Sequence, residues 1–407
     1  MTGNIKKQAI LFLVLLGIIS LLSDFTHEGA RSIYGPFLGL IGASAFVVSF
    51  TSGLGEFIGQ ALRIATGIIA DKSHKYWHMM FLGYAVNLLA IPLLAFVDAS
   101  IWQVAIVLIL LERVGKAIRA PAKSALVSFT TPHLGAGKSF AIQEVLDQIG
   151  AFLGPLFAFA VLSLNQGSEI DGYHLTFGFL GIFAIATLVI LIVSWKKYPN
   201  PEQFETRTTF SGFKGNKAFV FYMLAISMLA LGFIDYPLMA FHMEATSVIT
   251  VTYIPLLYSL AMGIDAIAAL IFGHLFDKYG VKSLQISTFI AAFSVPVFFL
   301  VSGLWAIVLG VVLWGIGMGA QESILKAVIS SIVSKEKRAT AYGIFYSVFG
   351  LAWFLGSTLI GIVYAYSILA IVIYSFAMEV GAVILLFVFS RAQKKEKLSI
   401  EHKADNS

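Results

Sequence analysis

The sequence predicts an all-α membrane protein with twelve transmembrane helices in two six-helix bundles and with both termini in the cytoplasm. Three observations support this prediction. Apolar runs fill nearly the whole chain, the loops between them are alternately rich in basic residues and free of them, and motifs of the first half recur in the second. The 407 residues are 58% hydrophobic and 12% charged, about half the charged fraction of a soluble domain. The net charge of +5 does not indicate a nucleic-acid partner, because the basic residues lie in the loops between apolar runs.

The apolar runs define the elements in order. A membrane-spanning helix needs about 20 mostly apolar residues, and twelve runs qualify. Lys6 and Lys7 precede the first run as they would in a signal peptide, but no small-residue cleavage site follows, so we expect a retained first helix. The predicted spans are 8–38, 44–70, 76–97, 101–129, 139–165, 174–195, 218–243, 249–276, 283–303, 305–333, 339–365 and 367–390.

The distribution of Lys and Arg predicts the orientation, because cytoplasmic loops of membrane proteins are enriched in these residues. With both termini in the cytoplasm, 20 of the 27 basic residues fall in cytoplasmic loops and tails and 7 fall within spans. The outer loops then carry only acidic residues, which are Asp98, Glu169, Asp171 and Glu244.

The longest polar stretch, 196–217, predicts the organisation into domains. It separates an N-terminal bundle at 1–195 from a C-terminal bundle at 218–407, and the latter ends in a charged cytoplasmic tail from Arg391 onward. We expect this stretch to be a cytoplasmic linker.

The two bundles share motifs. "GIIADKSHKY" begins at Gly67 and "GHLFDKYGVK" begins at Gly273, and each has Asp-Lys four and five residues after the Gly. Gly154 and Gly356 also correspond, at an offset of 202 residues. Two related halves are the architecture of many secondary transporters, in which the substrate binds between the halves near the membrane midplane.

These loops resemble the signature between helices 2 and 3 of the major facilitator superfamily, which recurs between helices 8 and 9. "GAFLGP", residues 150–155, resembles the core of that superfamily's antiporter motif, although Ala141 and Ala158 stand where the motif has Gly. "ERVGKAIRAPAKSAL" and "SFAIQEVLDQIGAFLGP" resemble a group of prokaryotic permeases in this superfamily. The resemblance covers all twelve spans and implies a multi-pass transporter of the inner (plasma) membrane.

The fourth span, 101–129, contains charges that lipid does not tolerate. Each charge facing lipid near the midplane costs about 2.5–3.5 kcal/mol, so these side chains must face a water-filled cavity or paired partners. Their spacing of four, three and four residues places them on one helical face, with Arg113 to one side. The charges on this face are Glu112, Lys116, Arg119 and Lys123.

We expect six residues to bind substrate: Arg31, Tyr34, Arg113, Lys116, Arg119 and Asp235. Asp235 is a single acid in apolar surroundings, and Pro237 is expected to break its helix locally. Two alternatives stay open for the cytoplasmic end of the fourth span. Arg119 and Lys123 can belong to a gate, or their long side chains can reach toward the membrane surface.

A second group of residues predicts proton coupling. Asp24, His27 and Glu28 share one face of the first span, and both carboxylates and His can carry a proton through a transport cycle. Glu112 and Asp147 are further candidates. A metal site and a structural pairing with Arg31 are the alternatives, although three ligands on one helical turn rarely complete a coordination sphere.

The repeated loops and the segment at 150–155 predict gating. Acids in such loops can cap helices or pair with basic residues in only one conformational state, and Gly at a spacing of four permits close helix packing. The alternative is that the repeated loops are only tight turns that carry the basic residues typical of cytoplasmic loops. The predicted gating residues are Asp71, Lys72, Lys123, Gly150, Gly154, Pro155, Asp277 and Lys278.

Together these observations predict a secondary transporter that works by alternating access, with proton-coupled export (antiport) preferred. The alternatives are proton-coupled uptake of an anionic metabolite, divalent metal transport and a non-transporting sensor. An enzyme is not expected, because no nucleotide loop, nucleophile elbow or zinc helix motif occurs and Cys is absent. We expect a monomer in the lipid bilayer with a small-molecule substrate and protons as partners, without cofactor, resident metal or nucleic acid.

Overall fold

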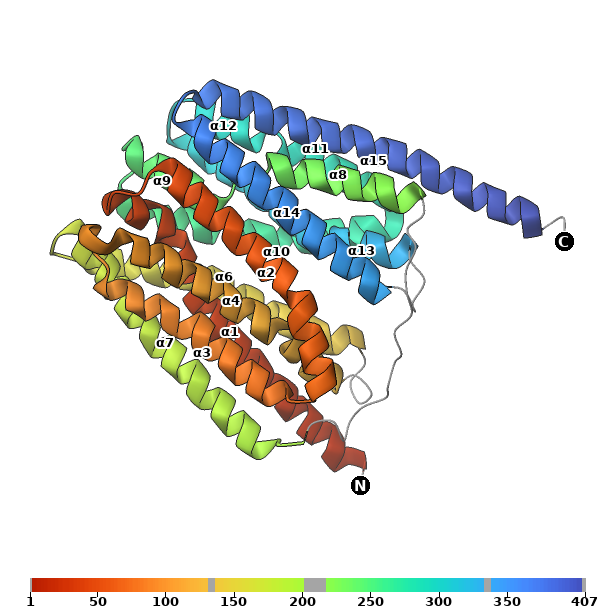
Figure 1. The fold of residues 1–407 in the computed structure, drawn as a ribbon, viewed down its shortest axis with the longest axis horizontal. Coiled ribbons are helices and arrows are strands. Elements are labelled where there is room, and N and C mark those ends of the chain that lie inside the picture. The colour runs from red at the N-terminus through yellow and green to blue at the C-terminus, as the bar shows by residue number, and fades with distance from the viewer. Residues whose placement is uncertain (1, 131–135, 201–216, 333–337, 405–407) are drawn as a thin grey trace. The chain divides into compact units, whose positions relative to one another are not determined.

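A computed structural model describes residues 2–130, 136–200, 217–332 and 338–404, and the described chain is almost entirely helical (Figure 1). Eleven stretches in the described part are long and apolar enough to span a membrane, which makes this a multi-pass membrane protein. Helix α4 (Trp102–Ser128) is not among them, because every window of its sequence contains several of the charges described above.

The chain divides into two compact units, and the first contains Met1–Thr208 together with Asp235–Met262. In this unit α1 packs against α6 and α7, α3 packs against α4 and α7, and α2 packs against α4. Short 3₁₀ turns, η1 (Leu94–Phe96), η2 (Ala99–Ile101) and η4 (Val251–Tyr253), join some of the helices. Its helices are α1 (Thr2–Leu40), α2 (Ala45–Ser73), α3 (Tyr76–Leu93), α4, α6 (Ala136–Leu164), α7 (Glu169–Lys197), α9 (Tyr236–Ala245) and the beginning of α10 (Ile254–Tyr279).

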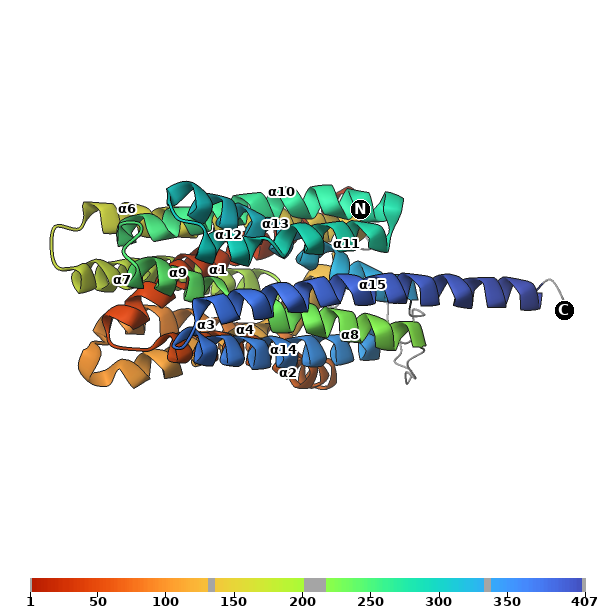
Figure 2. The ribbon, with the colours of Figure 1, turned by 90° about the horizontal axis from the view of Figure 1, so that it is seen from above.

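The second unit contains Thr209–Ile234 and Gly263–Ser407. Here α8 packs against α14 and α15, while α11 and α12 pack against α13 (Figures 1 and 2). Its helices are α8 (Lys217–Gly232), the rest of α10, α11 (Val281–Ala291), α12 (Ser294–Leu300), α13 (Leu304–Ile332), α14 (Arg338–Tyr364) and α15 (Ile368–Ala404).

Local sequence signals account for several helix ends. The Ser44 side chain accepts a hydrogen bond from the Val47 amide at the start of α2, and a capping box of Ser168 and Asp171 begins α7. Helix α2 ends at Ser73, and its C-cap His74 adopts a left-handed conformation with φ 53°. In the loop before η2, the Ser100 amide and hydroxyl donate to Asp98, and these hydrogen bonds lower the pKa of Asp98 from its ordinary value.

The seventh predicted span is interrupted, as expected, but upstream of Pro237. Helix α8 ends at Gly232 and α9 begins at Tyr236, with Asp235 as the N-cap whose side chain accepts from the Tyr236 amide. Pro237 instead lies in the first turn of α9, where its missing N–H costs nothing. The break also divides the predicted span between the two units.

Glycines at equivalent positions allow one close helix contact in each unit. A Cβ on Gly154 of α6 would collide with the Phe25 carbonyl oxygen of α1, and a Cβ on Gly356 of α14 would collide with the Leu231 carbonyl oxygen of α8. The sequence repeat therefore reappears as the same packing of paired helices in the two units.

The first unit has two apolar cores. One gathers around Phe37 and Phe177, and the other around Phe12 and Trp77. Along α1 and α4 the charged residues occupy the level between these cores, so apolar packing at both ends holds the polar middle of the unit.

Candidate functional site

Charged side chains from α1, α2, α4, α6 and the start of α9 gather in the middle of the first unit. We call this group the charged cluster. It contains six carboxylates and five cations, together with one histidine. Its members are Asp24, His27, Glu28, Arg31, Glu56, Glu112, Arg113, Lys116, Arg119, Lys123, Asp147 and Asp235.

His27 of α1 lies between two carboxylates of this cluster. Its Nδ1 is 2.7 Å from Glu112 Oε1, and its Nε2 is 3.5 Å from Glu28 Oε1. The His27 and Glu112 side chains are fully buried. A neutral imidazole can donate from one nitrogen only, whereas an imidazolium donates from both. His27 can therefore bind both carboxylates at once only when it carries an additional proton.

The Glu112 carboxylate is held in place from two other sides. The Asn87 side chain of α3 donates to it, and Arg113 Nε lies 3.3 Å from its second oxygen. Arg113 also reaches Glu56 of α2, with 2.9 Å between NH1 and Oε1. Although Arg113 lies to one side of the α4 stripe, it belongs to the same cluster because α2 covers that side of α4.

Arg31 connects α1 to the segment after the helix break. Its NH2 donates to Asp235 Oδ1 at 2.8 Å, and its guanidinium lies 3.7 Å from Glu28 and 3.6 Å from Glu56. Ser52 of α2 also donates to Asp235. On α10, the Tyr258 hydroxyl donates to Glu28 at 2.7 Å. Asp235 thus has two tasks, capping α9 and pairing with Arg31.

Two cations of the α4 stripe have their own carboxylates. Arg119 lies 3.4 Å from Asp24 and also stacks over the Tyr84 ring, with 4.5 Å between guanidinium carbon and ring centroid. Lys123 lies 2.7 Å from Asp147 and donates to Ser20 as well. These pairs link α4 to α1 and α6.

Lys116 differs from the other four cations of the cluster. It is half-buried near the middle of α4. Within the described part of the chain, no hydrogen bond or ion pair of its ammonium group occurs, although the charges of Glu28, Asp24 and Glu112 act on it from a greater distance. Its ammonium group is therefore the cation of the cluster that can accept a new anionic partner.

Tyr34, another predicted substrate contact, lies beside the cluster. Its hydroxyl is buried without a hydrogen-bond partner. It lines a cavity of about 10 Å³ together with Thr51, Ser52 and Arg113, which is room for about one water molecule. This cavity is too small for a metabolite.

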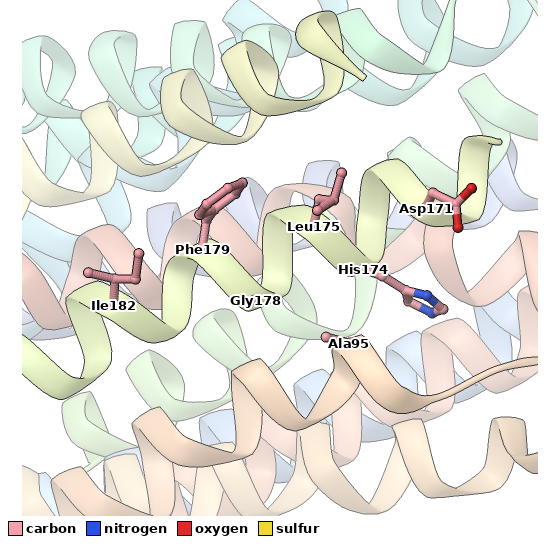
Figure 3. Close-up of a pocket in the computed structure, with 7 residues that line it drawn as sticks. All are labelled: Ala95, Asp171, His174, Leu175, Gly178, Phe179 and Ile182. Carbon is pink, nitrogen blue, oxygen red and sulfur yellow. The ribbon is translucent and has the colours of Figure 1, made fainter. Parts of the chain in front are cut away.

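A larger hollow of about 680 Å³ lies elsewhere, along the outside of α7 (Figure 3). Ala95, Asp171 and His174 contribute to it, and His174 Nε2 is within 2.8 Å of the Val97 carbonyl oxygen. The rest of its lining comes from α7 and consists of Gly178 and the exposed side chains of Leu175, Phe179 and Ile182. Apolar side chains exposed on a membrane helix face lipid, so this hollow is a surface feature and not part of the charged cluster.

The predicted gating residues lie in three places. Gly150, Gly154 and Pro155 are buried on α6, and the two glycines face the α1 backbone. Lys72 is exposed near the end of α2, and the side chain of Asp71 lies outside the described residues. Asp277 and Lys278 are exposed at the end of α10. Their gating role stays a prediction, while Lys123 belongs to the charged cluster.

Three residues of the site were not predicted from the sequence. Asn87, Ser52 and Tyr258 hold carboxylates of the cluster, and Asn87 is a lone buried amide in an otherwise apolar stretch of α3. A buried amide inside a membrane span is the signal that identifies such a residue. Among the described residues, no three His, Asp or Glu side chains are arranged to hold a metal ion.

The fold and this polar centre define a class, the membrane transporters with two repeated halves. Residues 13–264 and 233–406 match the family model of the Major Facilitator Superfamily, and the chain belongs to that family. An uncharacterised protein of Mycobacterium tuberculosis is 34% identical over 383 residues, with 92% of each chain covered. An uncharacterised MFS-type transporter of Methanocaldococcus jannaschii is 27% identical over 381 residues, covering 92% of this chain and 94% of the relative.

Solved structures agree on the fold. The nucleoside transporter NupG superposes with a TM-score of 0.71 at 15% identity, covering 93% of this chain and 98% of NupG. A peptide transporter POT in complex with sulfate superposes with a TM-score of 0.74 at 14% identity, covering 94% of each chain. The family and these structural neighbours are transporters and not enzymes, and membership implies a small-molecule substrate and a membrane environment.

Proposed function

We propose that this protein is a proton-coupled symporter of the inner (plasma) membrane that takes up a small anionic solute by alternating access. In this proposal α4 also spans the membrane, which brings the number of spans to twelve, both termini are cytoplasmic, and the protein transports as a monomer. The charges of α4 do not prevent it from spanning, because their partners lie within the protein.

Lys116 is the observation that carries the proposal. A cation that already forms a close ion pair must lose that partner before it can bind substrate, and breaking a buried pair is costly. Arg31, Arg113, Arg119 and Lys123 all have such partners. Among the described residues Lys116 has no close partner to lose, so a carboxylate or phosphate group of the solute can bind to it directly, with a charge-assisted hydrogen bond.

His27 is the proton carrier in this proposal. The six carboxylates of the cluster outnumber its five cations by one when His27 is neutral. A proton on His27 balances this charge and lets the ring bind Glu28 and Glu112 together. Asp24 and Asp147, two other predicted proton carriers, are held by Arg119 and Lys123.

The sign of the charges decides between symport and antiport. An anion bound at Lys116 adds a negative charge close to His27, and this charge favours protonation of the ring. Proton and anion therefore stabilise each other and travel together. In antiport the two must exclude each other, as a proton and a cationic solute would.

Anion binding is tested by a thermal-shift panel on the detergent-purified protein at matched ionic strength. The probes are succinate, citrate, sulfate, uridine monophosphate and tetraphenylphosphonium. We expect one or more of the anions to stabilise the wild type and not the Lys116→Ala variant, while the control variant Lys278→Ala behaves like the wild type. Stabilisation by the lipophilic cation alone would overturn the proposal.

A second candidate is proton-coupled export, the function preferred from the sequence. It is favoured by the close contact that Gly150 and Gly154 make with α1, in the segment that resembles the antiporter motif. Proteoliposomes separate the two candidates. An inward proton gradient drives accumulation of the anion inside the vesicles in symport and drives its release from preloaded vesicles in antiport.

A further inference from the structure

The second unit contains a buried acid that the charged cluster does not use. Glu379 of α15 is 2% exposed, and no hydrogen bond of its buried Oε2 occurs among the described residues. Within the described part of the chain, no ion pair of this carboxyl group occurs.

Glu379 lies next to the end of α8, where the chain breaks before α9. It lies beside Gly232, the last residue of α8, where a Cβ would lie 2.7 Å from the Met378 Cβ and 3.4 Å from the Glu379 Cγ. One turn earlier on α15, the Ser375 hydroxyl donates to the Gly232 carbonyl oxygen at 2.5 Å. Phe233 follows at once, and the chain then passes from the second unit to the first after Ile234.

The described parts of the elements that pack against α15 bring few charged groups. Helix α8 over 218–232 and helix α12 contain no charged residue, and Lys282 at the start of α11 is exposed. Tyr222 of α8 and Tyr342 of α14 donate to backbone carbonyls of α13, and α14 also carries Tyr346 and Tyr364. The side chain of Arg338 on α14 lies outside the described residues.

We propose that Glu379 is a second proton-binding site, which holds its proton at neutral pH and thereby keeps α15 packed against the end of α8. An isolated carboxylate inside a protein costs several kcal/mol, and a bound proton removes that cost. When the proton leaves, the charge must reach water, so α15 must separate from Gly232 beside the helix break. This site is independent of the function proposed for the charged cluster.

Infrared spectroscopy tests the proposal directly. We expect the purified wild type at neutral pH to show the carbonyl stretch of a protonated carboxyl group, and we expect Glu379→Gln to lack that component. Glu322→Gln, which changes an exposed acid of the same unit, serves as the matched control and should keep it. The component should disappear from the wild type as the pH is raised. Identical wild-type and Glu379→Gln spectra at every pH would overturn the proposal.

Two further measurements complete the test. Replacing sodium by choline at constant pH should leave the band unchanged, and a band that grows on sodium removal would mean that a metal cation and not a proton occupies the site. If Glu379→Gln does not fold, thermal unfolding of the wild type decides. A carboxyl group protonated in the folded state and ionised in the unfolded state makes the melting temperature fall as the pH rises, and a flat profile would contradict the proposal.

Discussion

Lys116 and His27 show how neighbouring charged residues take on different tasks. Four of the five cations in the charged cluster are fixed by close carboxylates, whereas Lys116 is not. His27 lies between Glu28 and Glu112, and its ring can donate a hydrogen bond to both carboxylates only when it carries an additional proton. Pairing, more than residue type, therefore distinguishes the proposed substrate contact from the cations that already form ion pairs.

Lys116→Ala should weaken binding of the anion that stabilises the wild type most. A hydrogen bond to a charged group contributes about 1.5–3 kcal/mol, so the dissociation constant should rise about 10- to 100-fold. Isothermal titration calorimetry measures this change, and Lys116→Arg should retain part of the affinity. Unchanged affinity in a well-folded Lys116→Ala variant would remove Lys116 from the site.

His27→Asn should separate transport from proton coupling. Asn is uncharged and cannot bind the additional proton, so accumulation driven by a pH gradient should fall at least about tenfold. Exchange of labelled for unlabelled anion, which needs no net proton movement, should persist. The control is His274→Asn, which changes an exposed histidine of α10. Gradient-driven accumulation at the wild-type level would exclude His27 as the carrier.

At the scale of the element, two backbone features set the geometry of the site. Glycines on α6 bring that helix onto the α1 backbone, and the break between α8 and α9 delivers Asp235 to Arg31. Both features were visible in the sequence as a Gly spacing of four and as a Pro near an acid. The sequence placed the break at Pro237, but the cap position of Asp235 determines where α9 begins.

Gly154→Ala should destabilise the protein, whereas Gly178→Ala should not. A Cβ at Gly154 collides with the α1 backbone, and one at Gly178 meets nothing within 4 Å. Overpacking costs about 1–3 kcal/mol, while Ala in an open helical position gains about 0.5–1 kcal/mol over Gly. Thermal unfolding in detergent measures both, and equal melting temperatures for the two variants would contradict the close contact.

Asp235→Asn should loosen the contact between α1 and α9 without disturbing the start of α9. Asn caps a helix as well as Asp does, but it removes the charge that Arg31 pairs with at 2.8 Å. Arg31 retains Glu28 and Glu56 at longer distances, so we expect a loss of about 1–3 kcal/mol. Chemical unfolding of Asp235→Asn is compared with Asp277→Asn, an exposed acid, and equal stabilities would argue against the pair.

At the scale of the whole molecule, the two units differ in polar chemistry. The first unit pairs most charges of the cluster with one another, whereas in the second unit no ion pair of the buried Glu379 occurs among the described residues. Proton-driven symport predicts that anion uptake into vesicles rises with an inward proton gradient and stops when a protonophore collapses it. Uptake that is indifferent to the protonophore at constant membrane potential would exclude proton coupling.

The sequence by itself determined that this is a multi-pass helical membrane protein of the Major Facilitator Superfamily, because apolar length, loop charge and a repeated motif are local properties of the chain. It also indicated that the charges of α4 face the interior, because lipid does not tolerate them. Only the tertiary structure decided which charges pair, since partners such as Arg31 and Asp235 lie 204 residues apart. Helical periodicity gives the face of a residue but not the helix opposite it. For that reason neither the missing partner of Lys116 nor the isolation of Glu379 could be read from the sequence.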